Sequence, residues 1–353
     1  MTYLLPLLLG LAHGASDAAA GLLVGLIIQQ KSADMNTQIL LYNLLAFGLQ
    51  PLAGLRFDHA HSFSPQQGAV ASLAVSLCGL LVMPLNLSLA IYLIGLGSAG
   101  LHAGGGAVAI RSTPGKASGP GVFAAFGVIG LSLGGIGSVN YAGALRWALV
   151  LVITSLAFLI WFTSQPGQKI LETSHSLLTP VPVSILIVLI IAVTLRSTVW
   201  VGSQMETTRY SLAALSVALA AGTGKFVGGF AADRFGWQRW TLVALPGAGL
   251  MLVFSNAWLP AIMLGAFLLQ SITPLSIAAA GRALPDSPAL AASLTLGTAI
   301  LAGGLPFFFL AGGWFGAGVM GFTLSLSAVL YWVAIKHPGL AAQHGFNGPT
   351  KAA

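Results

Sequence analysis

The sequence has 353 residues, of which 56% are hydrophobic and 6% are charged, and its mean hydropathy is +0.91. Soluble domains carry about 25% charged residues, so this chain has too little polar surface to cover a water-soluble globule. The net charge of +7 argues against nucleic acid as a partner, because the basic residues stand singly at the ends of apolar runs and form no basic face. The composition predicts an all-α polytopic membrane protein.

A membrane helix needs about 20 mainly apolar residues to cross the hydrocarbon core. The first apolar run begins at Tyr3 without a basic segment or a cleavage site, so we expect a retained helix rather than a signal peptide. The single Cys78 lies inside an apolar run, which predicts a packing role and no disulfide or thiol metal site. The length rule predicts twelve spans, at 3–29, 37–56, 66–84, 88–110, 119–140, 144–163, 181–204, 208–231, 239–256, 259–281, 288–311 and 315–335.

The longest stretch without a span lies between the sixth and the seventh. It predicts a six-helix bundle at 1–163, a cytoplasmic linker at 164–180, a second six-helix bundle at 181–337 and a cytoplasmic tail at 338–353. If both termini are cytoplasmic, nine Lys and Arg residues fall on the inside and three on the outside. This bias predicts a multi-pass protein of a bacterial-type inner (plasma) membrane with both termini in the cytoplasm.

The densest cluster of charge lies at 228–239, between two apolar runs, and a fainter copy lies at 50–58. Each copy places an aspartate four residues after a glycine at a helix-loop junction. We expect these loops to form a gate, in which Asp233 pairs with Arg234 or with the positive N-terminal end of a neighbouring helix. A purely topogenic role for the charges is the alternative. The expected gating residues are Gly54, Asp58, Gly229, Asp233, Arg234, Gly236 and Arg239.

The two loops resemble the signature Gly-x-x-x-Asp-Arg-x-Gly-x-Arg-Arg of the major facilitator superfamily. The later copy departs at Gln238, and the earlier copy has His59 where arginine would stand. This resemblance implies two pseudo-symmetric six-helix bundles that rock around a substrate near the middle of the bilayer. Four further stretches are similar to the fosmidomycin-resistance-type exporters of this superfamily, namely 13–17, 97–102, 195–202 and 274–297, although Ala103 and Gly104 replace the branch's usual Pro and Glu.

Ionisable groups deep in a membrane are costly and indicate function by default. Asp17 lies about halfway along the first span, and His13 precedes it by one helical turn on the same face, so the two side chains can share a proton. This arrangement predicts that Asp17 and His13 couple transport to protons. The alternative is a satisfied polar pair between packed helices.

His102 lies in the fourth span among glycines that allow close helix approach or local unwinding, so it faces either a cavity or a packing contact. Arg196 in the seventh span keeps its charge at any ordinary pH and needs an anion, which makes it a candidate substrate-binding residue. Its alternative is an anchor that reaches the outer interface. Lys225 follows glycines that superficially suggest a phosphate loop, but Phe226 stands where Ser or Thr is needed, so nucleotide binding is rejected.

Together these features predict a secondary active transporter that exports a small amphipathic or anionic compound in exchange for protons, and we expect it to be a monomer. Two alternatives are an importer or uniporter of a small metabolite or metal chelate, and a non-transporting membrane receptor. No set of nucleophile, base and acid indicates an enzyme, and no cofactor loop is present. We expect no resident metal either, because His59 and His61 beside Asp58 on a short loop are typical of a solvated site.

Overall fold

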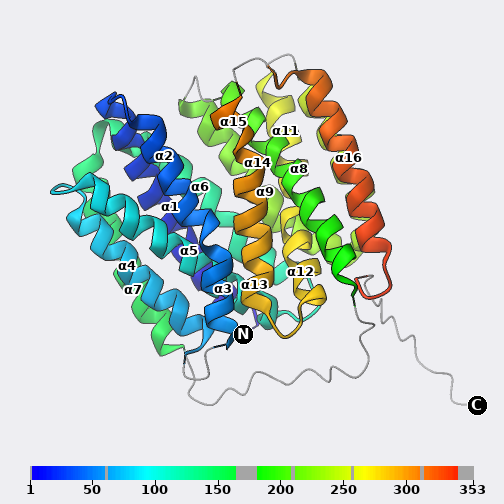
Figure 1. Ribbon diagram of the computed structural model, residues 1–353, viewed down its shortest axis with the longest axis horizontal. Coiled ribbons are helices and arrows are strands. Elements are labelled where there is room, and N and C mark those ends of the chain that lie inside the picture. The colour runs from blue at the N-terminus through cyan, green and yellow to red at the C-terminus, as the bar shows by residue number, and fades with distance from the viewer. Residues whose placement is uncertain are drawn as a thin grey trace, which may run out of the picture.

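The computed structural model describes residues 2–59, 63–163, 181–207, 211–255, 258–310 and 314–340. The predicted linker at 164–180 and most of the predicted tail lie outside these ranges, as do His61 and Arg209. Throughout the described part of the chain the regular secondary structure is helical (Figure 1). Eleven stretches of it are long and apolar enough to cross a membrane, and the chain is therefore a multi-pass membrane protein.

The helices of residues 4–162 match the first six predicted spans to within a few residues, because those spans are bounded by the polar and Pro-containing turns that stop each apolar run. The second span contains a π-helical turn, η1, between two α-helices. The bounds are α1 Leu4–Gln30, α2 Met35–Asn43, η1 Leu44–Gly48, α3 Gln50–His59, α4 Pro65–Val82, α5 Leu87–Ser112, α6 Ser118–Asn140 and α7 Ala142–Phe162.

The helices of residues 183–336 are more often interrupted. The tenth predicted span breaks between α11 and α12, where Pro274 stands in the first turn of α12, and the eleventh is divided into four helical pieces. The bounds are α8 Val183–Thr207, α9 Ser211–Phe235, α10 Trp237–Val253, α11 Leu259–Gln270, α12 Thr273–Ala283, α13 Pro288–Ser293, η3 Leu294–Thr298, α14 Ala299–Gly304, α15 Pro306–Phe309 and α16 Ala317–Lys336.

The predicted span at 239–256 coincides with α10, which has 17 residues and contains Pro246. At about 1.5 Å per residue this helix is roughly 25 Å long, less than the approximately 30 Å of a hydrocarbon core. Eleven of the described helical stretches are long and apolar enough to span a membrane, α10 is not among them, and the twelfth span stays a prediction.

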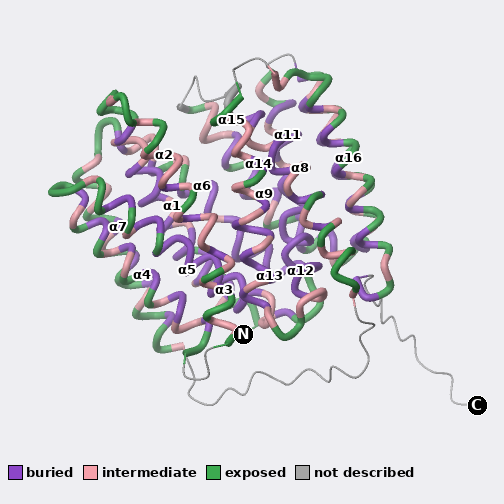
Figure 2. The backbone as a smooth tube through the Cα atoms, in the orientation of Figure 1, coloured by how far each residue is buried: buried purple, intermediate pink, exposed green. Residues whose placement is uncertain are grey.

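Two clusters of buried apolar side chains hold the fold together. One consists mostly of residues 9–160 and the other mostly of residues 189–340. In Figure 1 the helices of the first part of the chain, blue to cyan-green, lie on the left, and those from α8 onward lie on the right. Figure 2 shows that the buried backbone runs through the centre of the molecule, where the two sets meet.

Glycines allow the closest helix contacts. A Cβ atom added at Gly130 of α6 would lie 3.0 Å from the Gly14 Cα atom of α1, so the two helices touch at their small residues. Gly100 and Gly104, on either side of His102 in α5, allow α4 to approach in the same way. The α5 helix is continuous through them, so the structure has close approach rather than the alternative of local unwinding. Cys78 differs from its prediction, because its side chain is exposed on the outer face of α4 instead of packed inside.

Candidate functional site

The structure places His13 and Asp17 side by side on α1. The His13 Nε2 atom lies 3.2 Å from Asp17 Oδ2, and the exposed fractions of the two side chains are 4% and 16%. The spacing of four residues brings both side chains to one face of the helix, as the sequence predicts. A charged carboxylate this deep in the protein needs a cationic or hydrogen-bonding partner, and His13 supplies it.

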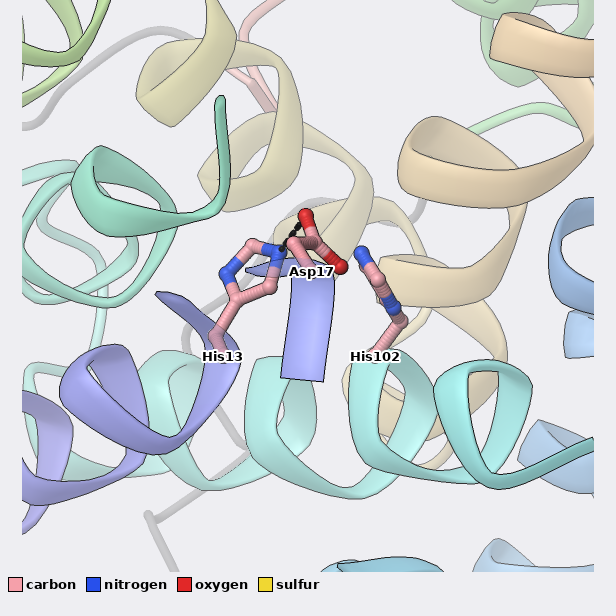
Figure 3. A group of neighbouring side chains, drawn as sticks. All are labelled: His13, Asp17 and His102. Carbon is pink, nitrogen blue, oxygen red and sulfur yellow. Dashed lines mark ion pairs between the residues drawn. The ribbon is translucent and has the colours of Figure 1, made fainter. Parts of the chain in front are cut away.

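His102 of α5 completes the cluster. Its ring lies edge-on to the His13 ring, with 4.4 Å between the ring centroids, and it is 4% exposed. Figure 3 shows the Asp17 carboxylate between the two imidazoles. One side-chain nitrogen or oxygen from each of the three residues lies within 4.8 Å of the others. Residues that are 85 or more positions apart in the sequence are thereby joined in one polar group.

Both imidazoles are oriented by backbone carbonyl groups. His13 Nδ1 donates to the carbonyl of Phe123 at 3.1 Å, and His102 Nδ1 donates to the carbonyl of Ser98 at 2.8 Å. The Phe123 ring also stacks on His13, with 4.8 Å between the centroids. These contacts turn the Nε2 atom of each ring toward Asp17. Ser98 lies one turn before His102 in α5. Phe123 was not predicted, because nothing in the local sequence marks a residue that orients a side chain of another helix.

Gly127 of α6 provides the space for the cluster. A Cβ atom at this position would lie 2.6 Å from Asp17 Oδ2 and closer still to the His13 ring. No carbon can be added there unless both side chains move. A glycine in a helix interior costs about 1 kcal/mol relative to alanine, so its presence here is consistent with a steric requirement.

We expect Gly127→Ala to lower the melting temperature of the purified protein in detergent. Overpacking against two buried polar groups costs about 1–3 kcal/mol, which exceeds the gain in helix propensity. The matched control is Gly143→Ala in α7, where a Cβ atom meets nothing within 4 Å, and its melting temperature should stay the same or rise. Equal shifts in the two variants would show that Gly127 does not make room for the cluster.

A cavity of 410 Å³ adjoins the cluster. Asp17 lies on its wall, together with residues of α1, α2, η1 and α6 that include Tyr42, Phe47 and Ser138. Small and apolar side chains make up most of the lining, and Asp17 is the one ionisable carboxyl among the described residues that line it. A buried acid beside a mainly apolar cavity has the features of a small-molecule or ion site.

Arg196 of α8 lies apart from this cluster, in the interior of the second set of helices. It is 2% exposed, and its Nη1 donates to the Gln270 side-chain oxygen at 3.3 Å. The Arg196 Nε is buried and has no hydrogen-bond partner among the described residues. This burial does not fit an anchor that reaches the membrane interface. The carboxylate of Asp17 pairs with His13 and not with Arg196, and Lys225 of α9 interacts electrostatically with both Arg196 and Asp17.

The two loop aspartates make the same contact in two places. Asp58 at the end of α3 accepts from the backbone N–H groups of Ala289 and Leu290, at 3.0 and 2.8 Å, in the first turn of α13. Asp233 at the end of α9 accepts from the N–H groups of Ala117 and Ser118, at 2.7 and 2.9 Å, where α6 begins. Each carboxylate satisfies orphan donors at a helix N-terminus and complements its positive end.

The motif glycines allow these contacts. A Cβ atom would lie 2.7 Å from the Ala289 carbonyl oxygen if added at Gly54, and 2.7 Å from the Ala117 carbonyl oxygen if added at Gly229. The glycine four residues before each aspartate therefore sets the helix distance at which the carboxylate reaches the opposing N–H groups. We call the two contacts, Asp58 with the start of α13 and Asp233 with the start of α6, the aspartate seals.

The remaining motif residues have different surroundings. Gly236 has φ +93°, a conformation that favours glycine, and it begins the sharp turn into α10. Arg234 and Arg239 are exposed, and Asp233 contacts α6 and the Trp237 indole N–H rather than Arg234.

Arg282 was not predicted as a site residue. It lies over the Trp237 ring and donates to the Gly115 carbonyl. It therefore joins α12 to the loop before α6 at the Asp233 seal.

Comparison with solved structures identifies this arrangement. The major facilitator superfamily transporter FucP in its outward conformation matches with a TM-score of 0.69 and 15% identity, over 95% of this chain and 98% of that one. A point variant of the E. coli fucose:proton symporter FucP matches with a TM-score of 0.64, the same identity and the same coverage. The chain has the major facilitator fold. No protein-family model and no curated protein matches the sequence.

The cluster of His13, Asp17 and His102 lies in the first and fourth spans of this fold, and the aspartate seals lie on the two loops that resemble the superfamily's signature. The resemblance that the loop motifs indicate is therefore matched by the three-dimensional fold. Both of these structures are of FucP, and the fosmidomycin-resistance branch stays a prediction from the sequence.

Proposed function

We propose that the protein is a secondary active transporter that exports a small amphipathic or anionic compound in exchange for protons. The observation that carries this proposal is the buried pair of His13 and Asp17 beside a cavity, 3.2 Å apart, in a chain with the major facilitator fold. Ionisable groups at this depth are costly, so their presence favours a role in binding an ion or a substrate.

In this proposal Asp17 carries the proton. The carboxylate takes up one proton when the cavity opens to the more acidic side and releases it when the cavity opens to the other side. His13 Nε2 accepts a hydrogen bond from the protonated carboxyl group, so the proton is held between two acceptors and stays off the apolar wall. Binding and release of this proton bias the two conformations of the transporter.

Two pseudo-equivalent bundles, at 1–163 and 181–337, would pivot around this pocket. The two clusters of buried apolar side chains support that division, since each is built mostly from one half of the chain. Both aspartate seals join one half to the other. We place them on the cytoplasmic side because the Lys and Arg bias favours cytoplasmic termini. Opening toward the cytoplasm must then break four hydrogen bonds to helix N-termini, which is the gating role of the loops.

Arg196 and His102 are the proposed substrate-binding residues. Arg196 keeps one buried N–H without a partner, and an anionic group of the substrate would satisfy it. His102 would contact the same substrate from the first half of the chain. A ligand found by thermal-shift screening of small anionic compounds provides the probe for this role.

We expect Arg196→Lys to weaken binding of that ligand about tenfold and Arg196→Ala to weaken it further. Lysine keeps the charge but loses the planar, multidentate donor geometry, and about 1.4 kcal/mol corresponds to a factor of ten. Isothermal titration measures the dissociation constants. Arg146→Ala is the control, because Arg146 lies over the Trp147 ring at the start of α7, and it should bind normally. Normal binding by Arg196→Ala would remove Arg196 from the substrate site.

Import is the second candidate for the direction of transport. Because one structural match is a fucose:proton symporter, proton-coupled import by this chain is the alternative to export. Everted vesicles with an acidic lumen distinguish the two. Adding substrate outside releases luminal protons if the protein exchanges substrate for protons, and it does not if substrate and proton move together. A non-transporting receptor would show no substrate counterflow in proteoliposomes.

A further inference from the structure

The cluster of His13, Asp17 and His102 has a ligand set that proton transfer alone does not require. Two imidazoles and a carboxylate converge from α1 and α5, and one ligand atom from each residue lies within 4.8 Å of the others. We infer that these three side chains bind a divalent transition-metal ion of the Zn²⁺, Co²⁺ or Ni²⁺ class. Nitrogen-rich sites of this kind favour such ions over Mg²⁺ and Ca²⁺, which prefer oxygen ligands.

The distances agree with metal coordination. Two ligands on a tetrahedral ion at about 2.0–2.1 Å from the metal are roughly 3.3 Å apart. His13 Nε2 and Asp17 Oδ2 are 3.2 Å apart, so this pair already spans one edge of such a site. The three ligand atoms already lie within 4.8 Å of one another, so the other two edges close if the His102 side chain approaches by at most about 1.5 Å.

The hydrogen bonds of the two imidazoles supply an independent argument. A backbone carbonyl can only accept, so His13 Nδ1 and His102 Nδ1 must each carry a hydrogen to bond with Phe123 and Ser98. In a neutral imidazole the Nε2 atom then has a lone pair, and both lone pairs point toward the Asp17 carboxylate. Three electron-pair donors that face one another repel unless a cation lies between them. Metal-binding histidines are oriented by this kind of second contact.

The cluster is open to a ligand on one side. Asp17 lines the cavity of 410 Å³, and Gly127 adds no carbon beside the carboxylate. Three protein ligands leave a fourth position of a tetrahedral ion for water or for a donor atom of a bound molecule. Lys225 interacts electrostatically with both Asp17 and His102, so a donor at the fourth position is favoured if it is anionic.

This site deepens the proposed function. If the protein transports as proposed, its cargo is the metal ion with an anionic ligand, and this role as cargo rests on the proposed function. Binding of the ion itself does not depend on transport. The metal and the proton would occupy the same space between Nε2 and the carboxylate, so the two cannot be bound together and the site would exchange one for the other.

Titration of the purified protein with Co²⁺ tests the inference. We expect one Co²⁺ ion per chain and the visible absorption of a four-coordinate cobalt centre. His102→Gln and His13→Gln should each weaken this binding at least tenfold and remove that absorption. The matched control is His59→Gln, because the exposed His59 ring bonds to the Leu55 carbonyl in its own helix and is not part of the cluster, and it should bind as the wild type does. Melting temperatures establish that each variant is folded.

A wild-type protein that binds no stoichiometric Co²⁺ would overturn the inference, as would equal loss in His102→Gln and His59→Gln. Either result leaves the proposed transport function standing, since proton coupling through Asp17 is measured separately. If His102→Gln fails to fold, Gly127→Ala provides the second test. It keeps all three ligands, displaces two of them, and is expected to weaken Co²⁺ binding while Gly143→Ala does not.

Discussion

Asp17→Asn is expected to abolish proton-driven transport and to leave substrate counterflow in place. Asparagine has nearly the same shape as aspartate but neither takes up nor releases a proton, so the variant can still change conformation with substrate bound while the pH gradient no longer drives it. Transport driven by a pH gradient should fall to the level of empty vesicles. Proteoliposomes with and without a gradient measure both activities, with the ligand from the thermal-shift screen as substrate.

The control for this experiment is Asp34→Asn. Asp34 is exposed between α1 and α2, so its carboxylate is solvated and carries no proposed role. Its gradient-driven transport should equal that of the wild type. Unchanged proton coupling in Asp17→Asn would eliminate Asp17 as the proton carrier, and the pair with His13 would then be a packing contact between helices.

The double variant Asp58→Asn, Asp233→Asn is expected to open both aspartate seals. A carboxylate at a helix N-terminus contributes about 1 kcal/mol, and asparagine keeps one acceptor but loses the charge. Removing both charges should shift the ratio of closed to open molecules by about 2 kcal/mol, or roughly 30-fold. Each single variant should give about the square root of that shift.

Cysteine accessibility measures this opening. Ala292 of α13 is buried against Gly106 of α5 inside the Asp58 seal, so Ala292→Cys in a Cys78→Ser background reports on it. A water-soluble maleimide should label this cysteine about 30 times faster in the double variant. Asp34→Asn should label at the rate of the parent protein. Equal rates in the parent and the double variant would mean that the two contacts do not hold the helices together.

Local spacing made part of the site predictable. His13 and Asp17 are one turn apart in one helix, so periodicity alone brings them together. The Gly-x-x-x-Asp pattern predicted contact with a helix N-terminus as one of two alternatives, and Asp233 makes that contact rather than the one with Arg234. Long apolar runs predicted most helix bounds, because a membrane requires a minimum length that the sequence displays directly.

Contacts between distant helices were not predictable from one sequence. Nothing near His102 in the sequence indicates that its ring meets His13. The histidines beside Asp58 are candidate metal ligands that lie close together in the sequence, but they are typical of a solvated loop, so no metal site was expected. Gly127 resembled any other helix glycine, although it determines whether the His13 and Asp17 side chains fit. Arg196 was predicted to lie within a membrane span, but its contact with Gln270 depends on how α8 and α11 pack. The length of α10 also differs from its prediction, because Trp237–Val253 ends before the apolar run does.

The most direct test of alternating access measures two distances between spin labels, one on each side of the membrane. The measurements are made at pH 5.5 and pH 8.5, which lie about one unit or more on either side of the ordinary histidine pKa of about 6.5. One pair joins His59 to Asp286 on the side of the seals, and the other joins Gln30 to Phe309 at the opposite ends of their helices. We expect one distance to lengthen while the other shortens, and we expect Asp17→Asn to remove this response. Distances that stay constant, that change in the same sense, or that respond equally in Asp17→Asn would contradict two bundles pivoting about a proton-binding pocket.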